Sequence, residues 1–199
     1  GRMDIRLVEK GHIVFDIGNV LLDFCPDRAV NTLAPDGMEE LYLKHVVGSH
    51  SWQELDRGTL TYHEAAKIMC NHPDMAGEYD NVSRFLYNFP ELMQVLPAVN
   101  ALEKLKSMGK KLYVLSNFHK PAFERVYKEY SFFRLFDGLC VSCYLHQIKP
   151  EPEIYISLLT DNSIPAEDAV FIDDVLENAK AAEQFGITGI HYQNDIDFS

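Results

Sequence analysis

Short apolar runs alternate with amphipathic segments over most of the chain. Five runs rich in β-branched and aromatic residues have the length of buried strands, and apolar residues recur at helical spacing between the later runs. Strands that alternate with helices predict an α/β, Rossmann-like parallel sheet with helices on both faces. The predicted strands are 12–16, 111–116, 139–143, 169–173 and 187–192, and the predicted helices are 98–108, 121–130, 152–160 and 175–185.

Residues 25–96 interrupt this alternation. They contain no strand-like run, and the Thr61-x-x-Glu64 sequence has the form of a helix capping box. Prolines at positions 26, 90 and 97 mark the expected hinges. We therefore predict a small helical bundle (25–96) inserted after the first strand into a core made of 1–24 and 97–199. The predicted helices of the insert are 37–47, 51–57, 61–70 and 78–88.

Composition narrows the possible partners. The 199 residues are 47% hydrophobic, which is enough for one sizeable core, and the net charge of −12 comes without any basic run. This negative charge argues against nucleic acid or an anionic membrane surface as a binding partner. Cys140 and Cys143 form a lone C-x-x-C in a strand-like segment, and we interpret them as buried thiols. With no targeting or membrane-spanning segment in this sequence, a cytoplasmic location is expected.

Polar residues follow four of the predicted strands. Ligands of doubly wound sheets bind outside the carboxyl ends of the strands, so these side chains should converge on one patch. Clustered carboxylates favour a hard divalent cation, Mg²⁺ above others, while a lysine, a hydroxyl and backbone N–H groups suit phosphate oxygens. An aspartate placed there can act as a nucleophile. The residues concerned are Asp16, Ser116, Asn117, Lys149, Asp173 and Asp174.

The sequence also contains four motifs in order: FDIGNVLLD, VLSN, IKPEPEIY and FIDDVLEN. They resemble the four motifs of the haloacid-dehalogenase-like hydrolase superfamily. The resemblance covers nearly the whole chain, and the helical insert stands where that superfamily has its small cap. The D-x-G-N-V opening and the R-G-x-x-T sequence of the insert are most similar to bacterial sugar-phosphate phosphatases of the α-glucose-1-phosphate phosphatase type.

This resemblance implies a reaction through an aspartyl-phosphate. Asp16 would be the nucleophile and also a Mg²⁺ ligand. Ser116, together with the backbone at Asn117, would hold the phosphoryl oxygens, and Lys149 would offset the charge between the phosphate and Asp16.

The rest of the implied metal site comes from three further positions. Asp174 would be the second side-chain ligand of Mg²⁺, and the backbone carbonyl of Gly18 would be another ligand. Asp173 and Asn178 would support the waters of the metal or position Lys149.

Gly18 is a departure from the pattern of the superfamily. Most phosphatases of this group have an aspartate there, which protonates the leaving group and then activates water. Glycine keeps the carbonyl for Mg²⁺ but loses proton transfer, which is typically worth about 10²–10⁴ in rate. We therefore expect a slow or selective phosphatase, with the proton supplied by water, the substrate or a cap residue. Asp23 lies where the chain leaves for the insert, so a structural hinge role is favoured over a substitute acid.

Substrate selection is expected in the insert. His45, His50, Trp52 and Arg57 are the candidate substrate contacts there, although tryptophan is often a core residue and Arg57 has the place of a solvated helix-end residue. The expected substrate is a small phosphorylated metabolite, most simply a sugar phosphate, and the oligomeric state is left open.

Three other functions share parts of this pattern. A receiver domain is excluded because its acidic pair follows the first strand, whereas Asp173 and Asp174 follow the fourth predicted strand. A haloacid dehalogenase also lacks the second aspartate of the first motif but needs no metal, so the acidic pair with Lys149 favours a phosphatase. A non-catalytic module that binds a phosphorylated ligand remains open because of Gly18.

Overall fold

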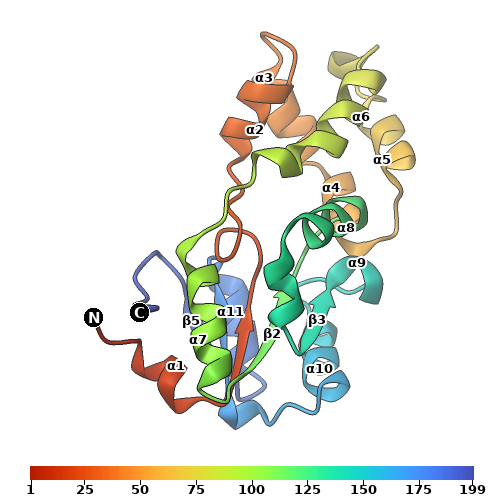
Figure 1. Ribbon diagram of the computed structural model, residues 1–199. Helices are drawn as coiled ribbons and strands as arrows, with labels where there is room; N and C mark the ends of the chain where they lie inside the picture. Colours follow the sequence, from red (N-terminus) through yellow and green to blue (C-terminus); the bar gives the residue numbers. More distant parts are fainter.

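One fully parallel sheet of five strands forms the core (Figure 1). The computed structural model describes residues 1–199, and the strand order is β3-β2-β1-β4-β5. This confirms the predicted Rossmann-like α/β class. The strands are β1 (His12–Phe15), β2 (Lys111–Ser116), β3 (Gly138–Val141), β4 (Ala169–Asp173) and β5 (Thr188–His191).

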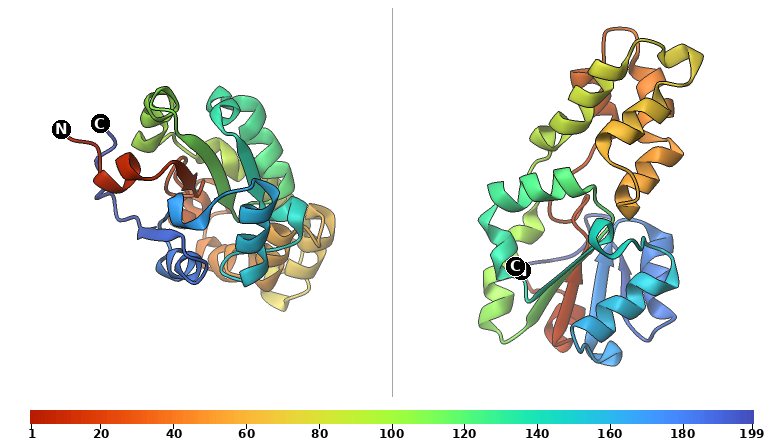
Figure 2. Two further views of the ribbon diagram at one scale, coloured as in Figure 1. Left: turned by 90° about the horizontal axis from the view of Figure 1, so that it is seen from below. Right: turned by 90° about the vertical axis from the view of Figure 1, so that its right-hand side faces the viewer.

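Helices cover both faces of the sheet, as Figure 2 shows. Side chains alternate along β1 because successive residues of a strand point to opposite faces. Ile13 and Phe15 therefore join one apolar cluster, whereas Val14 joins the other. The first cluster packs against α7 (Leu102–Ser107) and α8 (Lys120–Glu129), and the second packs against α10 (Pro152–Asp161) and α11 (Leu176–Glu183).

A helical cap occupies the end of the molecule that is uppermost in Figure 1. Thirteen buried residues give it a hydrophobic cluster of its own. Thr61 and Glu64 form the predicted capping box at the start of α5. The cap elements are α2 (Pro26–Leu33), α3 (Glu39–Tyr42), a π-helical turn (Leu43–Val47), α4 (His50–Arg57), α5 (Tyr62–Met69), α6 (Tyr79–Asn88) and the 3₁₀ turns Pro73–Met75 and Phe89–Leu92.

Some elements differ from the sequence prediction. Helix α1 (Ile5–Glu9) and α2 were not predicted, and α1 is too short to show a helical period. The predicted helix 98–108 begins as a 3₁₀ turn (Pro97–Ala101) before α7. Further 3₁₀ turns are Ser131–Leu135 and Ala166–Asp168.

The third predicted strand ends at Val141 rather than at position 143. Ser142 begins the short helix α9 (Ser142–Leu145) instead. Its hydroxyl accepts a hydrogen bond from Phe118 N at 3.0 Å and donates one to the backbone carbonyl of Asp56 in the cap. These two bonds turn the chain out of the sheet, so Cys143 is a buried thiol on a helix, not a strand residue.

Two connections join the cap to the core, and they run side by side. Leu22 and Val95 form an isolated antiparallel bridge, and Asp23 N donates to Gln94 O at 2.9 Å. The carboxylate of Asp23 accepts hydrogen bonds from Gln94 N and from Arg28 Nη2, both at 2.7 Å. Asp23 thus ties the outgoing and returning segments together, in agreement with a structural role at the hinge.

The C-terminal end of α4 docks the cap onto the core. Arg57 makes two hydrogen bonds to the carboxylate of Glu151, at 2.8 and 2.9 Å. Gly58 follows in the left-handed region (φ +78°), and a Cβ there would lie 2.2 Å from the carbonyl oxygen of Cys143 in α9. Only glycine allows the two backbones to approach this closely.

We predict that Gly58→Ala loosens the cap. Gly77→Ala is the matched control, because Gly77 has the same φ of +78° but no atom within 4 Å of a Cβ. In both variants the free energy of unfolding should fall by about 1 kcal/mol or more, because alanine is strained in the left-handed conformation. For Gly58→Ala the free energy of unfolding should fall by about 1–3 kcal/mol more, since the added methyl group overlaps the backbone of α9. Urea unfolding measures the difference, and equal losses in the two variants would contradict this close contact.

Candidate active site

The sheet topology determines where the site lies. From β1 the chain continues through β2 to β3 on one side of the sheet, whereas β4 and β5 lie on the other side. Such a switch point opens a crevice at the carboxyl ends of the strands. Asp16 directly follows β1 and its N–H donates to Ile172 O of β4 at 3.0 Å, so Asp16 and Asp173 lie next to each other.

A buried lysine connects these two aspartates. Lys149 Nζ lies 2.9 Å from Asp16 Oδ1 and 2.7 Å from Asp173 Oδ2, and it donates to Leu115 O at 3.1 Å. Two of these contacts are hydrogen bonds, to Asp173 and Leu115, and the contact with Asp16 is an ion pair. Burial by itself would lower the pKa of Lys149, but the two carboxylates outweigh it and raise this pKa above its usual value.

Residues at the end of β2 complete the surroundings of Lys149. The side-chain amide of Asn117 accepts from Lys149 N at 2.9 Å and donates to Lys149 O at 3.1 Å, which fixes the loop. Ser116 is fully buried, and its hydroxyl has no hydrogen-bond partner. A buried hydroxyl without a partner costs free energy, so an oxygen-rich ligand such as phosphate would satisfy it.

Three carboxylates form an acidic cluster beside the lysine. Ligand atoms of Asp16, Asp173 and Asp174 all lie within 4.8 Å of one another. Burial and the charge of Asp173 raise the pKa of Asp16 well above its ordinary value, and the same causes raise the pKa of Asp174. One lysine does not balance three carboxylates, and an all-oxygen donor set suits a hard divalent cation. The residues present therefore fit Mg²⁺.

The two oxygens of Asp16 differ in their surroundings. Oδ1 accepts a hydrogen bond from Ile17 N at 2.8 Å and forms an ion pair with Lys149 Nζ at 2.9 Å. Neither Ile17 N nor Lys149 Nζ contacts Oδ2. The carboxylate is thus held by one oxygen, and the other remains available to a ligand.

Asn19 belongs to the site and was not singled out by sequence reasoning. It adopts a left-handed conformation (φ +61°) and its amide donates to Asp174 Oδ2 at 3.2 Å. Its side-chain oxygen accepts from Phe24 N at 2.9 Å. A signal was present in the first motif, because asparagine is one of the few non-glycine residues that readily adopt positive φ. Its partners, however, depend on the fold.

A cavity of about 180 Å³ opens beside Gly18. Its walls are half aromatic: the ring of Trp52 packs against Phe24, Phe89 and His119, with centroids 5.8, 5.2 and 4.2 Å apart. A Cβ built at Gly18 would meet no atom within 4 Å, so the space for a side chain is open there. The lining residues are Gly18, Phe24, Trp52, Asp56, Phe89, Met93, Asn117, Phe118 and His119.

The predicted substrate contacts of the cap are mostly placed elsewhere. Trp52 lines the cavity, but His50 is exposed on the first turn of α4 and does not line it. Arg57 is neither free nor solvated at a helix end; its guanidinium is bound to Glu151. Asn178 is buried on α11 and makes no side-chain hydrogen bond to the acidic cluster. Asp56 and His119, which sequence reasoning did not select, do face the cavity.

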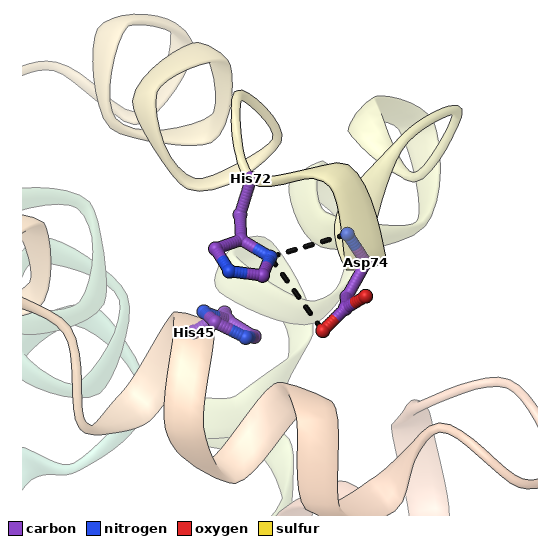
Figure 3. Close-up of side chains that lie close together, drawn as sticks. All are labelled: His45, His72 and Asp74. Carbon is purple, nitrogen blue, oxygen red and sulfur yellow. Dashed lines mark hydrogen bonds and ion pairs between the residues drawn. The ribbon is translucent and has the colours of Figure 1, made fainter.

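His45 belongs to a second cluster of possible metal ligands, which lies entirely within the cap (Figure 3). Its ring stacks on that of His72 with centroids 4.1 Å apart. His72 Nδ1 accepts a hydrogen bond from Asp74 N at 3.1 Å and lies 3.7 Å from Asp74 Oδ2. The Nδ1 lone pair of His72 is thus already used to cap the turn.

Comparison with known proteins identifies the family. A model of the haloacid dehalogenase-like hydrolases matches residues 11–186. The chain belongs to this hydrolase family. It is 25% identical to a sesquiterpene phosphatase of Aspergillus oryzae over 92% of this chain and 90% of that protein. It is also 25% identical to the D-ribitol-5-phosphate phosphatase of Bacteroides thetaiotaomicron, over 94% of each chain.

A solved structure confirms the fold of this family member. A haloacid dehalogenase family enzyme of Bacteroides thetaiotaomicron, crystallised with magnesium and inorganic phosphate, superposes with a TM-score of 0.77. The alignment covers 96% of this chain and 98% of that one at 21% identity. None of the helices in the present structure has the length and apolar character needed to cross a membrane.

We predict that Lys149→Met strongly destabilises the fold. Removing one partner of a buried ion pair typically costs about 3–5 kcal/mol, and here it leaves three carboxylates without a protein cation. The stability lost in the variant should become smaller as the pH is lowered. Asp16, whose pKa is already raised, then takes up a proton, which removes negative charge from the site. Urea unfolding across pH measures this, with exposed Lys180→Met as the control. A loss no larger than that of the control would contradict the role given to Lys149.

Proposed function

We propose that this hydrolase is a Mg²⁺-dependent phosphatase that cleaves phosphomonoesters through an aspartyl-phosphate on Asp16. The observation that carries the proposal is the environment of Asp16. Its Oδ1 is held by Ile17 N and Lys149, which leaves Oδ2 for a ligand, and the partnerless hydroxyl of Ser116 lies at the end of the neighbouring strand. A nucleophile beside a cation and a free donor suits the transfer of a phosphoryl group.

The proposed reaction has two steps. In the first, an oxygen of Asp16 attacks phosphorus and the ester bond to the leaving alcohol breaks. In the second, water attacks the aspartyl-phosphate, which releases inorganic phosphate and restores the carboxylate. Ser116 and the backbone at Asn117 would hold the phosphoryl oxygens in both steps, and Lys149 would offset their charge.

Mg²⁺ would be held by Asp16, Asp174 and the carbonyl of Gly18, with Asp173 supporting the site. When bound, it supplies positive charge to the phosphoryl oxygens and to the carboxylates. Asp173 also accepts hydrogen bonds from Lys149 Nζ and Val175 N, at 2.7 and 2.8 Å, so both of its oxygens are already used by the protein. It is thus better suited to positioning Lys149 than to binding the metal directly.

We propose a small phosphorylated metabolite as the substrate. The cavity of about 180 Å³ is smaller than the roughly 300–1,000 Å³ of typical drug-sized pockets. A sugar phosphate is the first candidate, as the resemblance to the α-glucose-1-phosphate phosphatase type implies, and the D-ribitol-5-phosphate phosphatase is a relative of matching length. The aromatic walls favour a second candidate with an apolar leaving group, consistent with the relative that acts as a sesquiterpene phosphatase.

The absence of a carboxylate at Gly18 supports a selective enzyme. The first-motif loop offers a carbonyl for the metal and open space, but no group that exchanges a proton. Substrates with poor leaving groups therefore need a proton from water, from the substrate itself or from another part of the protein.

We predict that Asp16→Asn abolishes phosphate release while the fold remains intact. The amide lacks the nucleophilic oxygen, although it can still pack at the end of β1. Phosphate release from p-nitrophenyl phosphate with Mg²⁺ measures the effect, and circular dichroism checks the fold. Asp161→Asn, at an exposed aspartate outside the site, is the control. Substantial activity in Asp16→Asn would refute the assignment of the nucleophile.

Chelation of the metal separates the proposed phosphatase from the two alternatives. We expect EDTA to stop phosphate release and added Mg²⁺ to restore it, because Lys149 alone does not balance the acidic cluster. A haloacid dehalogenase would instead release chloride from chloroacetate with or without EDTA. A binding module would show Mg²⁺-dependent binding of a phosphorylated metabolite without multiple turnovers of phosphate release.

A further inference from the structure

The cavity beside Gly18 contains two titratable residues, Asp56 and His119. Gly18 and Asn117 form its boundary with the phosphate-binding residues, so a leaving group attached to a phosphoryl group at Asp16 would extend into this space. Gly18 lines this cavity, and a Cβ built there would meet no atom within 4 Å, so position 18 has room for a side chain. Asp56 and His119 are therefore the candidate proton donors for a leaving group in this cavity.

Asp56 lies in the last turn of α4, with its side chain 18% exposed. Its carboxylate accepts no hydrogen bond from the protein, and the contact at ion-pair distance is His119 Nε2, 3.5 Å from Oδ1. The backbone carbonyl of Asp56 accepts from the hydroxyl of Ser142, which fixes this turn of the cap against the core. The carboxyl group is thus well positioned and has no partner that would commit it to a structural role.

His119 does not meet the requirement for a donor. Its ring is buried between Trp52 and Phe89, and Nδ1 shares a hydrogen bond with Tyr62 Oη at 3.1 Å. Burial lowers the pKa of His119 to about 3, so the imidazole is neutral at neutral pH. A neutral imidazole is a far weaker acid than a carboxyl group, and Nε2 of His119 has no hydrogen-bond partner, so Asp56 is the better proton donor of the two.

We propose that Asp56, a residue of the cap, is the catalytic acid that protonates the leaving-group oxygen in place of the side chain missing at Gly18. The proposal rests on the phosphatase function proposed above. In the first step, Asp16 attacks phosphorus, the ester bond breaks, and the Asp56 proton passes to the departing oxygen to give a neutral alcohol. In the second, water attacks phosphorus, its proton returns to Asp56, and the Asp16–phosphorus bond breaks to give inorganic phosphate.

The electrostatic surroundings agree with this assignment. Burial raises the pKa of Asp56 to about 8, opposed only in part by the charge of Lys149, so the carboxyl is protonated at neutral pH. The other titratable groups that face it are Tyr62, His119 and Cys143. Burial keeps the hydroxyl of Tyr62 and the thiol of Cys143 protonated, and His119 is neutral. A pKa near the operating pH is what an acid that is later regenerated as a base requires.

The test compares two leaving groups in Asp56→Asn. Hydrolysis of 2-phenylethyl phosphate, whose alkoxide must be protonated, should lose about 10²–10⁴-fold in kcat/KM. Hydrolysis of p-nitrophenyl phosphate should change by roughly tenfold or less, because its leaving group needs little protonation. In Gly18→Asp/Asp56→Asn the new carboxylate enters the same opening, and activity on 2-phenylethyl phosphate should return in part. Asp80→Asn, at an exposed aspartate of the cap, is the control.

The possible outcomes separate this proposal from the phosphatase function. Equal losses on the two phosphates, or no loss on either, would overturn the role of Asp56 while leaving the reaction at Asp16 intact. Failure of the wild-type protein to release phosphate from p-nitrophenyl phosphate would instead overturn the proposed function and, with it, the catalytic role of Asp56.

A second measurement needs no activity. A carboxyl whose pKa is raised on folding stabilises the protein below its unfolded pKa, and this stabilisation is lost as the pH rises to about 8. Asp56→Asn removes that loss, so the melting temperature of the variant relative to wild type should rise between about pH 4 and pH 8 and then level off. A difference independent of pH would show that Asp56 is ionised throughout this range and overturn the proposal.

Discussion

The ion pairs of Lys149 with Asp16 and Asp173 are the interaction on which the rest of the structure depends. The lysine joins the carboxyl ends of three neighbouring strands, because it also donates to Leu115 of β2. Removing these charges from water is costly unless each is paired, so the order of β2, β1 and β4 and the position of the lysine loop must be correct together. The same pairing leaves a surplus of negative charge beside a partnerless hydroxyl. The feature that holds the strand ends together is therefore also what suits the site to a metal ion and a phosphoryl group.

Much of the core site was predictable because it depends on local signals and topology. Asp16 and Asp173 end apolar runs that can only be buried strands, and a parallel sheet brings such ends to one edge. The end of the third strand was not predictable. Ser142 has no local reason to leave the sheet, and its hydrogen bonds reach Phe118 and Asp56, 24 and 86 residues away in sequence.

The cap shows where sequence reasoning ends. Its helices follow from periodicity, and Thr61 with Glu64 marks the start of α5, but which face of α4 meets the core depends on docking. Trp52 and Asp56 are one helical turn apart and both face the cavity, whereas Arg57, the next residue, reaches Glu151 in the core. A one-residue difference thus separates a cavity wall from a docking contact. The helical period alone could not decide this, because Ser51 and Leu55 of the same helix are buried as well.

The docking of α4 through Gly58 and Arg57 has a kinetic consequence if Asp56 supplies the proton. The acid belongs to the cap, whereas the nucleophile belongs to the core, so the two meet only while the cap is seated. A substrate too bulky for the cap to close over it could still place its phosphate at Ser116 and Lys149. It would bind with near-normal affinity but react slowly. Discrimination between phosphate esters of different alcohols would then be found in kcat rather than in KM. The cap would select substrates through proton transfer to the leaving group rather than through binding.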